Sequence, residues 1–265
     1  MKKILSFSSK ISDIYKVNYA MAFYYLIQLS LIIFIAKDYS LPISTSYITS
    51  DQLLVNANGN SVISSANSHL FDVNIKILIV ILLVISIIMY GCLATIYRNH
   101  YVKYLKRQNN PIRWIQSGIS NGLILVLVGM LGGIYELSTL GIIFILPIMA
   151  SVILLIEEQH KSLNQNSLSV WNKFSLVTAV IPLLIILCYV ISAGIYGVKG
   201  IGMYYYFLYV TVSFLYLSSY INLYLKTKKF GLWEKYIYSE QVYQMLEIVL
   251  ITVLIWQIFA GVLHS

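Results

Sequence analysis

The chain has 265 residues, of which 59% are apolar and only 11% are charged, and its mean hydropathy is +0.78. This composition excludes an ordinary soluble domain and predicts an integral membrane protein. The net charge of +8 does not require a nucleic-acid partner, because basic residues of a membrane protein gather on the face that meets anionic lipid headgroups.

Seven stretches are long and apolar enough to cross a bilayer, which takes about 20 residues of helix. Lipid offers backbone groups no hydrogen-bond partner, so each crossing is expected to be helical. The expected spans are Val17 to Ala36, Ile77 to Tyr97, Trp114 to Tyr135, Ser138 to Ile156, Phe174 to Ile195, Tyr204 to Leu225 and Val242 to Leu263. They predict one all-α membrane domain over residues 1–265, whose first span is retained because no small-residue cleavage site follows it.

Lysine and arginine predict the orientation, because loops that carry them stay in the cytoplasm during insertion. With the N-terminus inside, all but three of the 18 basic residues fall on the cytoplasmic side, and the exceptions are Lys37, Lys76 and Lys199. Seven spans then place the C-terminus outside. The prediction is a multi-pass protein of the cell membrane.

Residues 38–74 form the one long outer loop. Ser46 to Val55 and Ser61 to Ser65 carry β-branched or alternating apolar residues, and Asn58-Gly59 between them favours a tight turn. The pattern predicts a small extracellular β-hairpin, and the alternative is a flexible polar loop.

The remaining connectors are short. Arg98 to Arg113 is a basic connector whose Pro111 suits the first turn of the next helix. Only Glu136 and its neighbours separate the third and fourth spans, which predicts antiparallel neighbours joined by a tight outer turn. We interpret Glu157-Glu158, at the end of the fourth span, as a solvated inner face.

Several chemistries find no support in the sequence. Its histidines lie in loops or at the C-terminus, where they would not form a metal site in the core. Cys92 and Cys188 fall inside expected spans and suit packing as small apolar groups. No Ser-His-Asp arrangement or phosphate-binding loop is apparent, so the prediction is that the chain is not an enzyme.

The polar and aromatic residues between the apolar runs form a recognisable pattern. It comprises Asn110 to Gln159, Gly231-Leu232-Trp233, Ser239-Glu240-Gln241-Val242-Tyr243 and Trp256-Gln257-Ile258-Phe259-Ala260-Gly261. These segments resemble heliorhodopsins, the microbial-rhodopsin relatives with inverted membrane orientation. The resemblance covers most of the chain and implies a seven-helix rhodopsin-like bundle that forms homodimers.

The chain departs from that family at the two positions that retinal chemistry requires. Rhodopsins hold retinal as a protonated Schiff base on a lysine of the last helix, balanced by a carboxylate nearby. Counted back from Trp256-Gln257, the lysine position falls on Ile251, and the position of the family's counterion glutamate falls on Gln116. The two changes agree, because without an amine an ionised glutamate at position 116 would be an unpaired buried charge.

Further residues complete a candidate pocket. Tyr25 and Tyr90 align with two histidines that line the family's polar cavity, and Trp256 belongs to the conserved motif of the last helix by resemblance. Glu247 lies one turn before Ile251 on the same face and is the one acid well inside a span, which marks it as a functional candidate. A hydrated structural role near the cytoplasmic end is the alternative for Glu247. Other intramembrane polar candidates are Gln28, Asn121 and Gln257.

The leading hypothesis is a heliorhodopsin-like membrane protein without covalent retinal, with a sensory, regulatory or scaffolding role through its cytoplasmic face and an unidentified cytoplasmic protein partner. One alternative is an ion or proton channel or transporter that uses Glu247. Another is noncovalent binding of a retinoid, carotenoid or lipid in the aromatic cavity.

Overall fold

A computed structural model describes residues 2–55, 61–160, 168–197 and 202–264. Its elements are α1 (Lys2–Ile35), β1 (Ser40–Val55), β2 (Ser61–Asn74), α2 (Ile75–Ala94), α3 (Arg98–Lys106), α4 (Pro111–Leu131), α5 (Leu137–His160), α6 (Leu168–Tyr196), α7 (Met203–Thr227), the 3₁₀ turn η1 (Gly231–Glu234), α8 (Tyr236–Ile258) and the π-helical turn η2 (Phe259–Leu263). Within these residues, seven helices are long and apolar enough to cross a membrane. The seven predicted spans are therefore confirmed.

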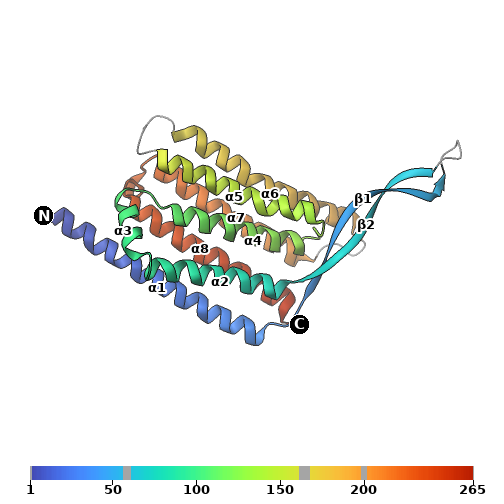
Figure 1. Ribbon diagram of the computed structural model, residues 1–265, viewed down its shortest axis with the longest axis horizontal. Helices are drawn as coiled ribbons and strands as arrows, with labels where there is room; N and C mark the ends of the chain where they lie inside the picture. Colours follow the sequence, from blue (N-terminus) through green and yellow to red (C-terminus); the bar gives the residue numbers. More distant parts are fainter. Residues whose placement is uncertain (1, 56–60, 161–167, 198–201, 265) are drawn as a thin grey trace.

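The seven long helices form a bundle, and a two-stranded hairpin projects from one end of it (Figure 1). Helices that follow one another in the bundle pack side by side, and α8 returns to α1. Helix α4 also contacts α2, α6, α7 and α8. In its span 67% of the residues are buried, against 28–39% in the other six spans. Side chains of α4 are thus well placed to reach the bundle interior.

Helix α5 lies close against α4 because α4 presents two glycines to it. A methyl group added at Gly122 would lie 2.7 Å from the carbonyl oxygen of Phe144, and one added at Gly118 would lie 3.1 Å from the Cα of Ile148. The two glycines are four residues apart and share one helix face, which is the small-residue spacing that allows membrane helices to approach closely.

The turn between α4 and α5 is as tight as the sequence predicts. Gly133 takes a φ of 92°, a conformation that glycine adopts without steric cost. Glu136 then accepts hydrogen bonds from the hydroxyl groups of Ser138 and Thr139, and these lower the pKa of the Glu136 carboxyl. The carboxylate thereby caps the first turn of α5 and fixes the reversal of direction.

The predicted hairpin is present and is longer than expected. Strands β1 and β2 are antiparallel, and the pairing runs from Ser40 opposite Asn74 to Val55 opposite Ser61. The predicted turn at Asn58-Gly59 lies outside the described residues. At the base of the hairpin, the Ile75 amide donates to the Tyr39 carbonyl (2.8 Å) and the Ser44 amide donates to the Tyr135 carbonyl (2.8 Å).

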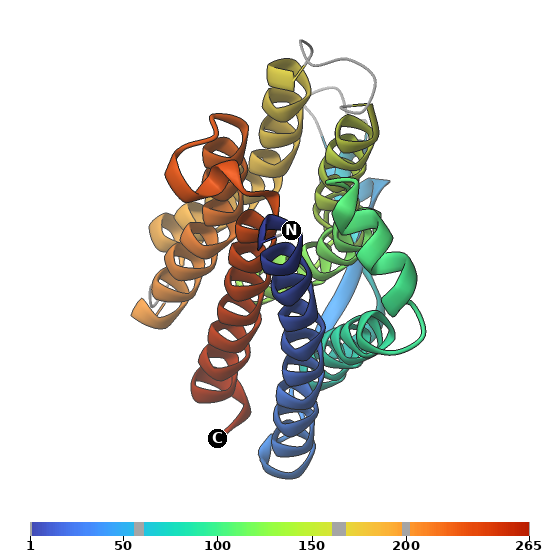
Figure 2. The ribbon, with the colours of Figure 1, turned by 90° about the vertical axis from the view of Figure 1, so that its left-hand side faces the viewer.

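Helix α3 was not expected, because the sequence was interpreted as a basic connector there. Its Tyr101 and Leu105 are buried and pack with Leu93 of α2 and with Tyr236 and Ile237 of α8. Residues four apart lie on one helix face, so this pair was the available signal. The helix lies across the end of the bundle opposite the hairpin (Figure 2). Burial raises the pKa of Tyr101 to about 12.

Candidate functional site

Ile251 is the residue that the sequence resemblance predicts at the position of a retinal lysine. The side chain is fully buried in the hydrophobic core of the bundle. Lys76, which the sequence places near the hydrocarbon, instead donates its Nζ to the Ala36 carbonyl (2.7 Å) at the hairpin end. Ile251 belongs to the same hydrophobic cluster as the apolar side chains of Leu250, Leu254 and Ile255.

Glu247 is held by two neutral donors from other helices. Tyr90 of α2 donates its hydroxyl hydrogen to Oε2 of Glu247 (2.6 Å), and Gln116 of α4 donates from Nε2 to Oε1 (3.0 Å). The Tyr25 ring of α1 lies 5.9 Å from the Tyr90 ring, centroid to centroid. Four side chains that the sequence singled out thus come together, and we call Tyr25, Tyr90, Gln116 and Glu247 the Glu247 cluster.

Trp256 does not join this cluster. It lies nine residues beyond Glu247, which at about 100° per residue is the opposite face of α8, and its half-buried ring packs on Phe259 with centroids 5.6 Å apart. The other polar candidates also bond elsewhere. Gln28 donates to Thr252 Oγ1 (2.9 Å) and Asn121 donates to Ser117 Oγ (3.1 Å). For Gln257 the backbone carbonyl accepts from the Tyr204 hydroxyl (2.9 Å), while its side-chain Oε1 is buried with no partner among the described residues.

A second group of polar residues, which the sequence did not predict, lies at the bundle end opposite the hairpin. Its charged members come from four helices, and we call them the charged cluster: Arg113 (α4), Glu158 (α5), Lys226 (α7) and Glu240 (α8). All four side chains are nearly inaccessible, with exposed fractions of 2–11%. Two cations and two carboxylates make the cluster formally neutral, and their mutual attraction offsets part of the cost of removing the charges from water.

Glu158 is the acceptor that joins the helix ends in this cluster. Its carboxylate accepts from Trp114 Nε1 (2.8 Å), Lys226 Nζ (2.9 Å), the Asn110 amide (3.0 Å) and the Tyr236 hydroxyl (3.1 Å). The interpretation of Glu157-Glu158 as a solvated face is therefore wrong, since both residues are buried. The carboxylate stays in the interior because its donors arrive from three other helices.

Arg113 joins the two carboxylates of the charged cluster. Its guanidinium forms an ion pair with Glu240 and lies 3.5 Å from Glu158. The same group lies between two aromatic rings, 3.9 Å from the Trp114 centroid and 4.5 Å from the Tyr243 centroid. Stacking of this kind favours arginine over lysine. One signal was available in the sequence: residues of opposite charge lie at the ends of four spans that the predicted topology places on the same side of the membrane.

One small cavity adjoins both groups. Its volume is about 10 Å³, which suits about one water molecule. The lining includes Glu247, Tyr90 and Gln116 of the Glu247 cluster and Arg113 and Glu240 of the charged cluster. Small-molecule sites commonly offer about 300 Å³ or more, so a retinoid could enter this space only if the helices separated.

The chain was compared with models of known protein families. The model of the heliorhodopsin family matches residues 14–263, which is nearly the whole chain. None of the curated proteins compared with the chain matches it.

Proposed function

Because the chain belongs to the heliorhodopsin family, we propose that it is a rhodopsin-like membrane protein that carries no covalent retinal and acts as a sensory or regulatory component. The observation that supports the retinal-free state is Ile251, a fully buried hydrocarbon side chain at the family's lysine position. An isoleucine has no amine with which an aldehyde can condense. The neutral Gln116 at the counterion position agrees with this reading.

The role through the cytoplasmic face is supported by the contact between the two polar groups. Glu247 shares a cavity with Arg113 and Glu240. A change in the charge of Glu247, or in its bonds to Tyr90 and Gln116, would act on the charged cluster across the cavity that they share. The charged cluster in turn joins the ends of α4, α5, α7 and α8. A protein partner would therefore bind at the ends of these helices. A homodimer is expected from the family.

The test of the retinal-free state is reconstitution with all-trans retinal. Purified protein, shown to be folded by its thermal unfolding transition, is incubated with retinal, and one half is reduced with borohydride. The proposal expects no hydroxylamine-sensitive visible band and no gain in intact mass after reduction. Either a bleachable band or a covalent adduct would overturn it.

A second candidate function is proton transfer through the bundle. The specific observation that favours it is the water-sized cavity, which places the carboxyl of Glu247 near that of Glu240. In proteoliposomes with a pH-sensitive dye inside, this function expects proton flux that the variant Glu247→Gln reduces at least about tenfold, since proton relays depend on such acids. Flux equal to that of empty liposomes would reject it.

A further inference from the structure

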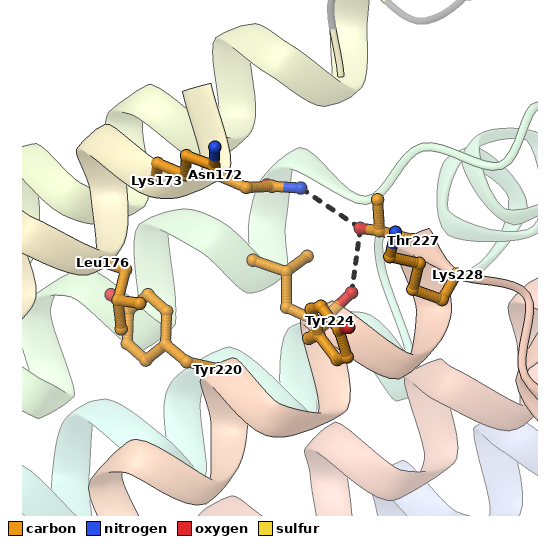
Figure 3. A pocket seen from close by; sticks show the side chains of 8 residues that line it. Asn172, Lys173, Leu176, Tyr220, Tyr224, Thr227 and Lys228 are labelled. Carbon is orange, nitrogen blue, oxygen red and sulfur yellow. Dashed lines mark hydrogen bonds between the residues drawn. The ribbon is translucent and has the colours of Figure 1, made fainter. Parts of the chain in front are cut away.

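A cavity of about 420 Å³ lies between α6 and α7, apart from both polar groups described above. It is lined by Asn172, Lys173 and Leu176 of α6 and by Tyr220, Leu223, Tyr224, Thr227 and Lys228 of α7 and its cap (Figure 3). The lining residues come from the start of α6 and the end of α7, so the cavity is at the bundle end opposite the hairpin. This is the end that the lysine and arginine distribution predicts to be cytoplasmic.

We propose that this cavity binds an anionic phospholipid of the cytoplasmic leaflet. The eight lining residues include two lysines and no carboxylate. The side chains of Lys173 and Lys228 are exposed, unlike that of Lys226, which is buried against Glu158. Two exposed ammonium groups, for which the described residues show no ion pair, attract a phosphate at the membrane surface, and basic pockets between membrane helices are a recurrent form of headgroup site.

The cavity is polar at the helix ends and apolar deeper in the bundle, as a phospholipid is polar at its headgroup and apolar along its acyl chains. Lys228 and Thr227 lie at the end of α7, while Tyr220 lies about 12 Å deeper along the helix axis. On α6, Leu176 lies one turn deeper than Asn172 and Lys173. The exposed Leu176 and Tyr224 face the lipid side of the bundle, so an acyl chain can continue from the cavity into the hydrocarbon. A free phosphate ion would use the lysines and leave the apolar part empty.

The hydrogen bonds of Asn172 leave one acceptor for the headgroup. Its Nδ2 donates to Thr227 Oγ1 (3.1 Å), and the Thr227 hydroxyl donates to the Leu223 carbonyl (2.9 Å). The Asn172 Oδ1 atom is buried and has no partner among the described residues. Buried polar atoms normally find a partner, and the hydroxyl of a glycerol headgroup is a donor of the required kind.

The experiment is native mass spectrometry of the full chain with phosphatidylglycerol and phosphatidylcholine present in equal amounts. We expect the wild type to retain phosphatidylglycerol at least about tenfold more than phosphatidylcholine, because each lysine contributes independently. The double variant Lys173→Gln/Lys228→Gln should lose this preference. The matched control Lys103→Gln/Lys106→Gln removes two exposed lysines of α3 at the same bundle end and should keep it within about twofold.

Two further measurements separate the sources of the phosphate. Leu176→Trp fills the apolar part without changing charge and should reduce retention of the lipid as strongly as the double variant. Inorganic phosphate, added in detergent to the protein with phosphatidylglycerol bound, should not displace the lipid. Equal retention of the two lipids, a preference that survives in Lys173→Gln/Lys228→Gln, or displacement by phosphate alone would overturn the proposal.

Discussion

At the scale of single residues, the membrane interior of this chain contains a carboxylate whose partners are neutral. Glu247 has Tyr90 and Gln116 as its hydrogen-bond donors, and its backbone position is one turn from the apolar Ile251. A carboxyl group in such surroundings depends on each donor, because removal of one leaves a buried acceptor unsatisfied. Tyr25, beside them, has a buried hydroxyl with no partner among the described residues.

These two tyrosines form a matched pair for mutation. Tyr90→Phe removes the hydrogen bond to Glu247 and should lower the free energy of unfolding in detergent by about 1–2 kcal/mol. Tyr25→Phe removes a buried hydroxyl that has no partner among the described residues and should leave the free energy of unfolding unchanged or raise it by up to about 1–3 kcal/mol, because the cost of burying an unsatisfied group is removed. Unfolding transitions followed by tryptophan fluorescence measure both. Equal effects of the two variants would contradict the assignment.

The charged cluster should be more sensitive. Arg113→Met leaves Glu158 and Glu240 with fewer cations in a buried site, and the expected loss is about 3–5 kcal/mol of unfolding free energy. Lys103→Met, which removes an exposed cation of α3, should cost less than about 0.5 kcal/mol. A small effect of Arg113→Met would show that water screens the cluster.

The two polar groups differ in how far the sequence could predict them. Glu247 could be singled out because an acid inside an apolar span is conspicuous, and the resemblance supplied the alignment of Tyr90 and Gln116. Glu158 could not, since an acid at a helix end is usually solvated. Its burial depends on Trp114, Lys226 and Tyr236, and only the three-dimensional packing brings those donors together.

At the scale of elements, the contact between α4 and α5 is the tightest constraint on the interior helix. Gly122→Ala would place a methyl group against the backbone of Phe144, and such overpacking costs about 1–3 kcal/mol. Gly141→Ala, on α5 with open space around it, should be neutral or stabilise by up to about 1 kcal/mol through helix propensity. Thermal unfolding of both variants in the same detergent tests the difference, and a destabilising Gly141→Ala would refute it.

Elements were predictable where their signal is local. The seven spans follow from apolar length, and the hairpin follows from alternation around Asn58-Gly59. Helix α3 is nine residues long and mostly polar, so its apolar signal was short, and the pair Tyr101 and Leu105 was the part of it with helical spacing. That pair packs with Leu93, which is near in sequence, and with Tyr236 and Ile237 of α8, which are remote, so the contacts that bury it could not be read from the local sequence.

At the scale of the whole molecule, the orientation is a prediction that labelling can check. In a background without Cys92 and Cys188, a cysteine at the exposed Ser68 of β2 should react in intact cells with a membrane-impermeant maleimide. A cysteine at His100 of α3, also exposed, should react only after the cells are opened. The opposite pattern would show that the membrane orientation is the reverse of the predicted one and that the lysine-lined cavity faces the outer leaflet.

The hairpin also has a mechanical consequence. Strand β1 is 16 residues long, so the ribbon measures roughly 50 Å along its length and acts as a lever arm. Its base is tied to the start of α2 through Ile75 and to the α4–α5 turn through Tyr135, and the adjoining Lys37 amide donates to the Leu263 carbonyl at the end of the chain. A sideways force on the far end of the strands would therefore exert a torque, equal to the force times the length of the arm, on several helix ends at once.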